Sequence, residues 1–314
     1  MHIVILGAGA IGRLLGVYLR RCDHDITFVE PRTEVVEAIN GAGVGFMEQD
    51  ATDPDAVVRV PARAVAHADE IRECDLVLLA VKSFDTLTAI RAASHLVSEE
   101  SPVITLQTGL GNIEQMERVV DRRAIIGGFT FMAATALGPG IVRHGGTGKT
   151  YLGELDSRIT DRLRNICDIF NRCGLSCTPV HRFMGRLWCK VIVYSAINSL
   201  SSILRVKNGQ LIESMESITL MKRLIDEGRT VAEAHAVDLV FPDLYELLFT
   251  ACRTTSDNIS SMLQDILAGQ RTEIDAQCGA LVRFGTRAGI SVPTHQTMVE
   301  LVRLIERKET AIAA

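Results

Sequence analysis

The first sixteen residues, MHIVILGAGAIGRLLG, constrain the fold more than any other stretch of this chain. An apolar run at residues 3–6 stops at three closely spaced glycines, and an apolar pattern with helical spacing follows them. This order predicts a buried parallel strand, a tight turn and the start of an amphipathic helix.

The glycines of this turn have separate physical roles. Gly7 permits a sharp turn, Gly9 lets the backbone approach a pyrophosphate without a Cβ in the way, and Gly12 lets helix and strand pack closely. The start of the helix offers unpaired N–H groups and partial positive charge to the phosphates. The turn therefore predicts a dinucleotide site, and a tight strand–helix turn without a ligand is the alternative. The predicted cofactor-binding residues are Gly7, Gly9, Ala10, Ile11 and Gly12.

The end of the second predicted strand, residues 25–30, bears on the choice of dinucleotide. Glu30 stands where folds of this type place an acid that accepts hydrogen bonds from the ribose hydroxyls. This favours NAD, because a carboxylate repels a 2′-phosphate. Arg32 favours NADP, because a guanidinium there can pair with that phosphate, although it can equally be a solvated loop charge. The residues alone leave both cofactors open.

Later segments continue the alternation of strands and helices. Residues 74–82 predict a buried central strand, with Lys82 just past the edge where open α/β sheets bind ligands. Lys82 can also be a solvated lysine at a strand end. Residues 102–106 and 124–132 predict two further strands, and the turn after the first of them places Thr108 at the same edge. We therefore predict a doubly wound parallel (Rossmann) sheet over residues 1–182, with right-handed crossovers.

Two shorter segments complete this predicted domain. Residues 34–40 predict a short helix that ends at Gly41. Residues 143–150 (RHGGTGKT) predict a hairpin between strands at 140–142 and 151–153. A phosphate-binding loop of the ATPase type would need glycine where Arg143 stands, so we exclude ATP binding.

From residue 183 onward the pattern predicts an all-helical second domain, residues 183–314. Lys190 lies in an apolar stretch, where a lysine is costly unless it is paired or functional. Asn198 lies eight residues further along the chain, which places it about a quarter-turn around the same helix from Lys190. Asn258 and Ser261 are three residues apart and are expected to share a helical face. Each of these polar residues taken alone can be a cap or a solvated surface residue.

Composition excludes several classes of function. The net charge of −5 gives no basic surface for nucleic acid, and apolar runs such as residues 76–81 are too short to span a membrane. The chain begins directly with a core strand, so we expect no leader peptide and a cytoplasmic protein. The eight cysteines are scattered, which predicts reduced thiols and no metal site.

Several blocks along nearly the whole chain resemble the ketopantoate reductase family (2-dehydropantoate 2-reductase). The last block is the most specific, whereas the glycine turn alone is common to many dehydrogenases. The matching blocks are GAGAIG at residues 7–12, AVKSFDT around Lys82, QTGLGN around Thr108, WCKVIVYSAIN around Lys190, KNG at residues 207–209 and NISSMLQDILAGQRTEID at residues 258–275.

The resemblance implies that the chain reduces 2-dehydropantoate to (R)-pantoate with NADPH, in the pantothenate route. It implies that Lys190 is the catalytic lysine and Glu273 the active-site glutamate, and that Lys82 lies where cofactor and substrate meet. It also implies a helical second domain similar to the C-terminal domain of 6-phosphogluconate dehydrogenase. The substrate-binding residues that it implies are Asn198, Asn208, Asn258 and Ser261.

Two positions depart from the family pattern. Thr108 stands where the family usually has asparagine, and Tyr194 stands where it usually has asparagine four residues after the catalytic lysine. A related reductase of another 2-oxo acid is therefore an alternative, and a non-catalytic nucleotide-binding regulator is a second one. By analogy with the class, a homodimer is expected.

Overall fold

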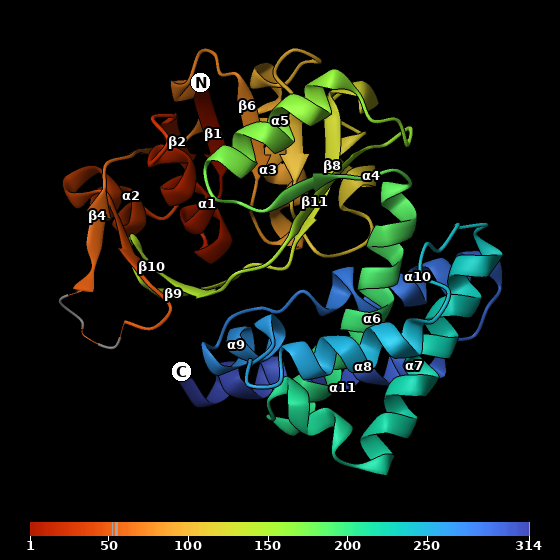
Figure 1. Ribbon diagram of the computed structural model, residues 1–314. Coiled ribbons are helices and arrows are strands. Elements are labelled where there is room, and N and C mark those ends of the chain that lie inside the picture. The colour runs from red at the N-terminus through yellow and green to blue at the C-terminus, as the bar shows by residue number, and fades with distance from the viewer. Residues whose placement is uncertain (52, 54–55, 314) are drawn as a thin grey trace. The chain divides into compact units, whose positions relative to one another are not determined.

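The computed structural model describes residues 1–51, 53 and 56–313. Contacts within the chain divide it into two compact units (Figure 1). We call the first the Rossmann unit, which comprises Met1–Gln107 and Asn112–Phe183. We call the second the helical unit, which comprises Thr108–Gly111 and Met184–Ala314.

An eight-stranded sheet forms the centre of the Rossmann unit. Six of its strands, from β8 to β5, are parallel, which confirms the doubly wound core. Strands β11 and β12 run the other way, because β11 pairs antiparallel with β8 and parallel with β12. In sheet order the strands are β12 (Cys177–Pro179), β11 (Thr150–Glu154), β8 (Ile125–Thr130), β7 (Val103–Thr105), β6 (Leu76–Leu79), β1 (His2–Leu6), β2 (Asp25–Val29) and β5 (Arg63–Val65).

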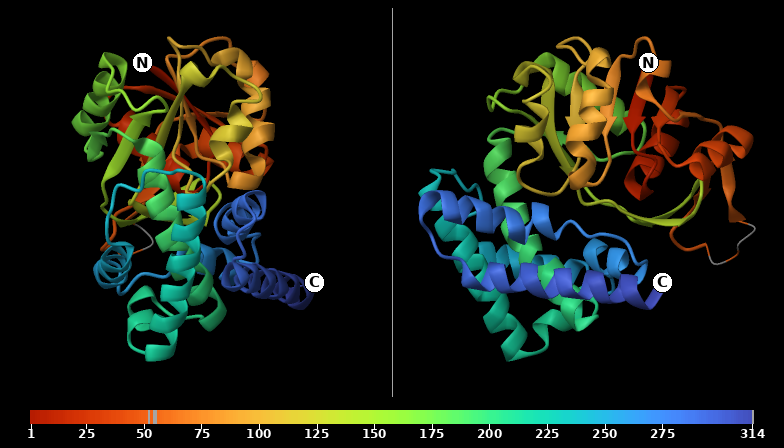
Figure 2. Two further views of the ribbon diagram at one scale, coloured as in Figure 1. Left: turned by 90° about the vertical axis from the view of Figure 1, so that its right-hand side faces the viewer. Right: turned by 180° about the vertical axis from the view of Figure 1, so that it is seen from behind.

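Helices cover both faces of this sheet, as the edge-on view in Figure 2 shows. Alternate residues of β1 explain why: Ile3 and Ile5 join one buried cluster, and Val4 and Leu6 join another. The first cluster includes residues of α1 and α5, and the second includes residues of α3 and α4. These helices are α1 (Ala10–Arg20), α3 (Thr86–Ala92), α4 (Asn112–Met116) and α5 (Asp161–Arg172).

A second, four-stranded sheet was not predicted, and it corrects two expectations. The predicted hairpin at residues 143–150 is wrong, because β10 pairs with β9 and β3, whereas β11 belongs to the large sheet. Helix α2 (Thr33–Ala42) continues through Gly41 and ends before Gly43, whose φ of 73° suits glycine. The strands in sheet order are β4 (Val58–Val60), β3 (Val44–Met47), β10 (Ile141–Gly146) and β9 (Ala133–Gly138).

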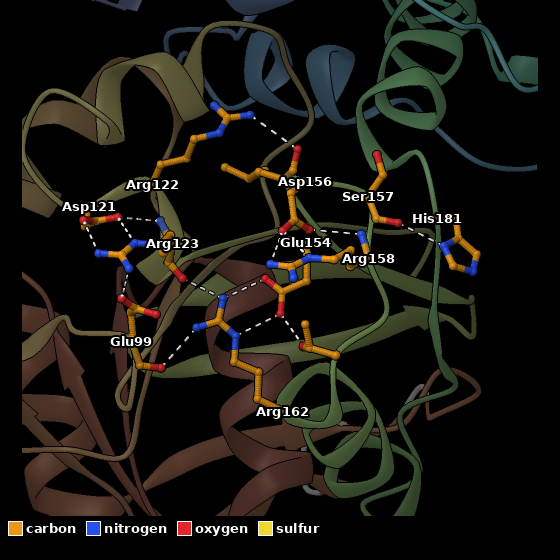
Figure 3. A network of polar contacts seen from close by, with 12 residues as sticks. Glu99, Asp121, Arg122, Arg123, Glu154, Asp156, Ser157, Arg158, Arg162 and His181 are labelled. Atoms are coloured by element: carbon orange, nitrogen blue, oxygen red, sulfur yellow. Dashed lines mark hydrogen bonds and ion pairs between the residues drawn. The ribbon is translucent and has the colours of Figure 1, made fainter.

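A polar network fixes the start of α5 at the end of β11 (Figure 3). Glu154 is buried, and its two oxygens accept hydrogen bonds of 2.9 and 2.7 Å from the Arg162 guanidinium. Thr160 donates to Glu154 and caps α5 by accepting from the N–H of Leu163. Such a bidentate pair on a buried carboxylate joins the end of the strand to the following helix.

The helical unit is built around α6 (Phe183–Leu204), whose first residue belongs to the Rossmann unit. By length and composition this helix could cross a membrane, contrary to our estimate from apolar run lengths, but 83% of its most apolar window is buried inside the structure. Burial identifies it as a core helix. The remaining helices are α7 (Met215–Ala234), α8 (Leu244–Thr254), α9 (Ser261–Leu267), α10 (Cys278–Ala288) and α11 (Pro293–Ala313), with short 3₁₀ turns η6 (Asn208–Ile212) and η7 (Ile274–Ala276).

Candidate functional site

The glycine turn between β1 and α1 has the shape of a phosphate cradle. Gly7 has a φ of +96°, and a Cβ on Gly12 would lie 2.2 Å from the carbonyl oxygen of Gly7, so both positions require glycine. A Cβ on Gly9 would meet a single atom within 4 Å, the carbonyl oxygen of Ala80 at 4.0 Å, which leaves the space beside the backbone open. The turn therefore fits a pyrophosphate.

The start of α1 completes this cradle. Its N-cap residue is Gly9, which has no side chain that could accept a hydrogen bond. The first N–H groups of the helix are therefore not capped by a side chain. Ala10 and Ile11 are the first two helical residues and are both partly exposed. These N–H groups are the donors that would hold the phosphates of a dinucleotide.

Glu30 follows β2 and is buried, with its carboxylate already hydrogen-bonded. Its Oε1 accepts from the Arg32 backbone N–H (3.1 Å) and from Arg32 Nε (2.8 Å). Its Oε2 accepts from the Ala8 N–H (3.1 Å) and from an Arg32 terminal nitrogen (2.9 Å). Four donors fill the roughly four lone-pair positions of a carboxylate. Burial alone would raise the pKa of Glu30, but the bonds from Arg32 and Ala8 hold it below its usual value.

Arg13 contributes to this region and was missed by the sequence analysis. It is buried in α1, and its guanidinium donates to the carbonyl oxygens of Gly9, Gly138 and Ile141. Burial and the charge of Arg32 lower its pKa to about 10. The sequence feature that could have indicated it is an arginine directly after the glycine motif. Through these hydrogen bonds Arg13 joins the glycine turn to the four-stranded sheet.

Lys82 and Thr108 occupy the two predicted sheet-edge positions. Lys82 lies three residues past β6 and is partly exposed. Thr108 follows the buried Gln107, whose amide donates 2.8 Å bonds to Val81 O and Thr86 Oγ1. Residues Thr108–Gly111 group with the helical unit, where the Leu110 N–H donates to Ala276 O.

Lys190 lies within α6 and is only 6% exposed. Desolvation by burial lowers its pKa to about 7. Its Nζ lies 5.5 Å from the centre of the Tyr194 ring, one helical turn further along α6. An amine of this kind gains or loses its charge near neutral pH, whereas an ordinary exposed lysine stays charged there.

The predicted polar residues of the helical unit divide into buried and exposed ones. Asn198 is buried and donates a 3.0 Å bond to Gln277 Oε1. Asn208 is buried and donates to Thr255 Oγ1, while its Oδ1 is a buried acceptor without a hydrogen-bond partner among the residues that the structure describes. A donor group of a ligand would satisfy that acceptor. Glu273 is partly exposed and precedes η7.

Asn258 and Ser261 do not share a helical face, so that prediction is wrong. Asn258 lies before α9, where its carbonyl oxygen accepts from the Asn208 N–H. The helix begins at Ser261 because Ser260 is its N-cap and accepts from the Leu263 N–H. Both Asn258 and Ser261 are exposed, whereas Ser260 is buried against Ser201.

Family models match most of the chain. The model described as "Ketopantoate reductase PanE/ApbA" matches residues 3–157, and "Ketopantoate reductase PanE/ApbA C terminal" matches residues 182–306. The chain belongs to the ketopantoate reductase family. This confirms the resemblance that the sequence blocks indicated.

Curated relatives in the family match over nearly their whole length. The 2-dehydropantoate 2-reductase of Halobacterium salinarum is 32% identical over 308 residues, covering 98% of this chain and 99% of that protein. The enzyme of the same name from Pyrococcus horikoshii is 32% identical over 306 residues, covering 98% of each chain.

Solved structures show the same fold. A PanE/ApbA family ketopantoate reductase from Ralstonia eutropha superposes with a TM-score of 0.87 at 31% identity, covering 98% of this chain and 99% of that one. D-mandelate dehydrogenase, solved with NADH and anilino(oxo)acetate, superposes with a TM-score of 0.91 at 24% identity, covering 98% and 99%. The second likeness concerns the fold alone.

Proposed function

We propose that this protein reduces 2-dehydropantoate to (R)-pantoate with NADPH. Its membership of the ketopantoate reductase family and its full-length likeness to enzymes named 2-dehydropantoate 2-reductase support the substrate. The observation that carries the chemistry is the buried amine of Lys190, whose pKa of about 7 suits proton transfer at neutral pH.

Reduction of a 2-oxo acid adds a hydride to the carbonyl carbon and a proton to the carbonyl oxygen. The nicotinamide supplies the hydride when it is bound. Negative charge develops on the oxygen, and the Lys190 ammonium would stabilise that charge and donate the proton. The glycine turn and the start of α1 would hold the cofactor through its phosphates.

The remaining predicted residues would orient the substrate. Glu273 would orient Lys190 or hold the substrate hydroxyl. Asn258 and Ser261 would bind the carboxylate and hydroxyls, and the open acceptor of Asn208 supports recognition of a hydroxyl donor. Asn198, Lys82 and Thr108 are proposed to line the substrate and nicotinamide positions.

The state of Glu30 supports NADPH over NADH. A free carboxylate here would accept hydrogen bonds from the ribose diol of NADH, but the four donors around Glu30 leave it no open position. Arg32 is about half exposed, offers further donors and offsets the charge of Glu30. A 2′-phosphate would therefore meet a guanidinium rather than a bare carboxylate.

We expect Arg32→Ala to raise the KM for NADPH roughly 10- to 100-fold and to leave the KM for NADH equal or lower, since charge-assisted bonds of this kind contribute about 1.5–3 kcal/mol. Steady-state kinetics with each cofactor measures this. Arg158→Ala is the matched control, because Arg158 is an exposed arginine of the same unit that pairs with Asp156. An equal effect on both cofactors would contradict the NADPH assignment.

One assay tests the proposed function directly. The purified protein is given 2-dehydropantoate or another 2-oxo acid, and oxidation of NADPH and of NADH is followed separately. We expect turnover of 2-dehydropantoate with NADPH. Turnover of another 2-oxo acid alone would favour the related reductase, which Tyr194 and Thr108 suggest, and cofactor binding without turnover of any acid would favour a regulator.

Three further assignments belong to this proposal. Residues 1–182 would be the dinucleotide-binding domain and residues 183–314 the substrate domain. The protein would act in the cytoplasm on a small molecule. A homodimer is proposed by analogy with the class, and light scattering in solution measures it.

A further inference from the structure

Lys190 must satisfy two requirements that conflict. A proton donor must carry its proton at the working pH, yet burial disfavours the charged amine. Burial lowers the pKa of the amine to about 7, so the charged form is no longer strongly favoured at neutral pH. A neighbour that favours the ammonium without neutralising it would increase the active fraction.

Tyr194 has the geometry of such a neighbour. It lies four residues after Lys190 on α6, so the two side chains lie on the same side of the helix. Lys190 Nζ lies over the Tyr194 ring at 5.5 Å from its centre, within the ~6 Å over which a cation is attracted to the ring face. The ring carries no net charge, so it supports the ammonium less strongly than a carboxylate would and leaves the proton transferable.

We propose that Tyr194 is a positioning residue for the proton donor, and that its ring face holds the Lys190 amine in place and in its charged form. This inference rests on the proposed function, because Tyr194 acts through Lys190. It also gives a physical role to the departure from the asparagine that the resemblance leads us to expect at this position, since an amide has no ring face to offer.

Two titratable groups that the structure describes at the ring, the Tyr194 hydroxyl and the Cys252 thiol, stay neutral while Lys190 titrates. Burial raises the pKa of the Tyr194 hydroxyl to about 12. Cys252 on α8 acts electrostatically on Tyr194, and burial raises the pKa of its thiol to about 11. Both groups keep their protons near neutral pH, so neither one changes charge there or competes with Lys190 as an acid. The expected contribution of Tyr194 is therefore that of the ring itself.

The experiment compares Tyr194→Phe, which keeps the ring, with Tyr194→Leu, which removes it but keeps an apolar side chain. The pH profile of kcat/KM for reduction is measured for each. Reduction needs the protonated amine, so activity falls as pH rises through the pKa of Lys190, and losing the ring moves this fall to lower pH. We expect the wild-type midpoint in Tyr194→Phe and a midpoint about 0.5–1.5 units lower in Tyr194→Leu.

A second readout does not depend on turnover. In protein labelled with ¹³C at lysine Cε, Lys190 would titrate near pH 7, far below ordinary lysines at about 10.4, and its signal is identified by its absence in Lys190→Ala. The midpoint of this signal is expected to fall in Tyr194→Leu as in the kinetic profile. This NMR shift without any reduction of 2-dehydropantoate would support the role of Tyr194 and reject the proposed function.

Two outcomes would overturn the role of Tyr194. One is an unchanged NMR midpoint in Tyr194→Leu, with activity lost equally at every pH, which would mean that the ring only fills space. The other is a shift in Tyr194→Phe as large as that in Tyr194→Leu, which would assign the effect to the hydroxyl. Circular dichroism and cofactor binding confirm that each variant is folded.

Discussion

Replacing Lys190 by alanine is expected to lower kcat for reduction of 2-dehydropantoate by roughly 10²–10⁴-fold while leaving the dissociation constant for NADPH within about twofold. The reason is that general acid catalysis contributes a factor of this size, and that the cofactor-binding residues of the glycine turn are in the Rossmann unit. Steady-state kinetics and fluorescence titration of NADPH measure the two quantities.

The wild-type pH profile belongs to the same prediction. Because the amine must be protonated to act, kcat/KM for reduction is expected to fall as pH rises through about 7. Lys222→Ala, at an exposed lysine of α7, is the matched control and should keep both the rate and the profile. Turnover by Lys190→Ala within about tenfold of wild type would reject Lys190 as the proton donor.

Replacing Glu227 by glutamine is expected to lower the free energy of unfolding by about 2–4 kcal/mol. Glu227 on α7 accepts from the N–H groups of Thr294 (2.8 Å) and His295 (3.0 Å) and from His295 Nδ1 (2.9 Å). Its carboxylate therefore caps the start of α11 from another helix. Urea unfolding at neutral pH measures the loss.

The pH dependence of this difference has a definite sign. Burial raises the pKa of Glu227, but the bonds from His295 and Thr294 outweigh it and bring the pKa down to about 2. The stabilisation is therefore complete above about pH 4.5 and is lost as pH falls toward 2. The difference in the free energy of unfolding between wild type and Glu227→Gln should become smaller as the pH is lowered. Glu233→Gln, at an exposed glutamate of the same helix, should change stability by less than about 0.5 kcal/mol, and an equal loss there would contradict the capping role.

The parts of the fold that could be predicted are those with local signals. The run from His2 to Gly12 changes from strand to glycine turn to helix within a few residues, and the structure has β1 and α1 there. Strand β6 could be predicted equally well, because a largely apolar run of that length is typical of a buried central strand. Family membership followed from the blocks around Lys190 and residues 258–275.

The four-stranded sheet could not be predicted as a whole, because the pair that joins its two local halves, β3 with β4 and β9 with β10, lies between residues far apart in sequence. Strand β3 at residues 44–47 pairs with β10 at residues 141–146, and no local pattern in either run specifies that partner. The same crossing reverses β11, since the chain returns from the second sheet without a crossover helix. Helix α5 then connects β11 to the parallel strand β12, which therefore has the same reversed direction.

The candidate site was predicted less completely than the fold, because the sequence pattern does not show which side chains hydrogen-bond to one another or to the backbone. The sequence placed Glu30 and Arg32 as competing signals for the cofactor, whereas the structure pairs them with each other. Asn258 and Ser261 were judged by helical spacing, but the capping preference of Ser260 decided where α9 begins. In both cases a short-range hydrogen bond prevailed over the periodic pattern.

The burial of α6 has a consequence for synthesis of the chain. This apolar helix ends at Leu204, and α11, which contributes the His295 ring that contacts Ser195 on α6, begins only at Pro293. At roughly 5–20 residues per second, α6 leaves the ribosome several seconds before this contact can form. During that interval its apolar surface is not yet covered by α11, so the nascent chain passes through a stage in which a helix of membrane-spanning length and hydropathy lacks part of its packing.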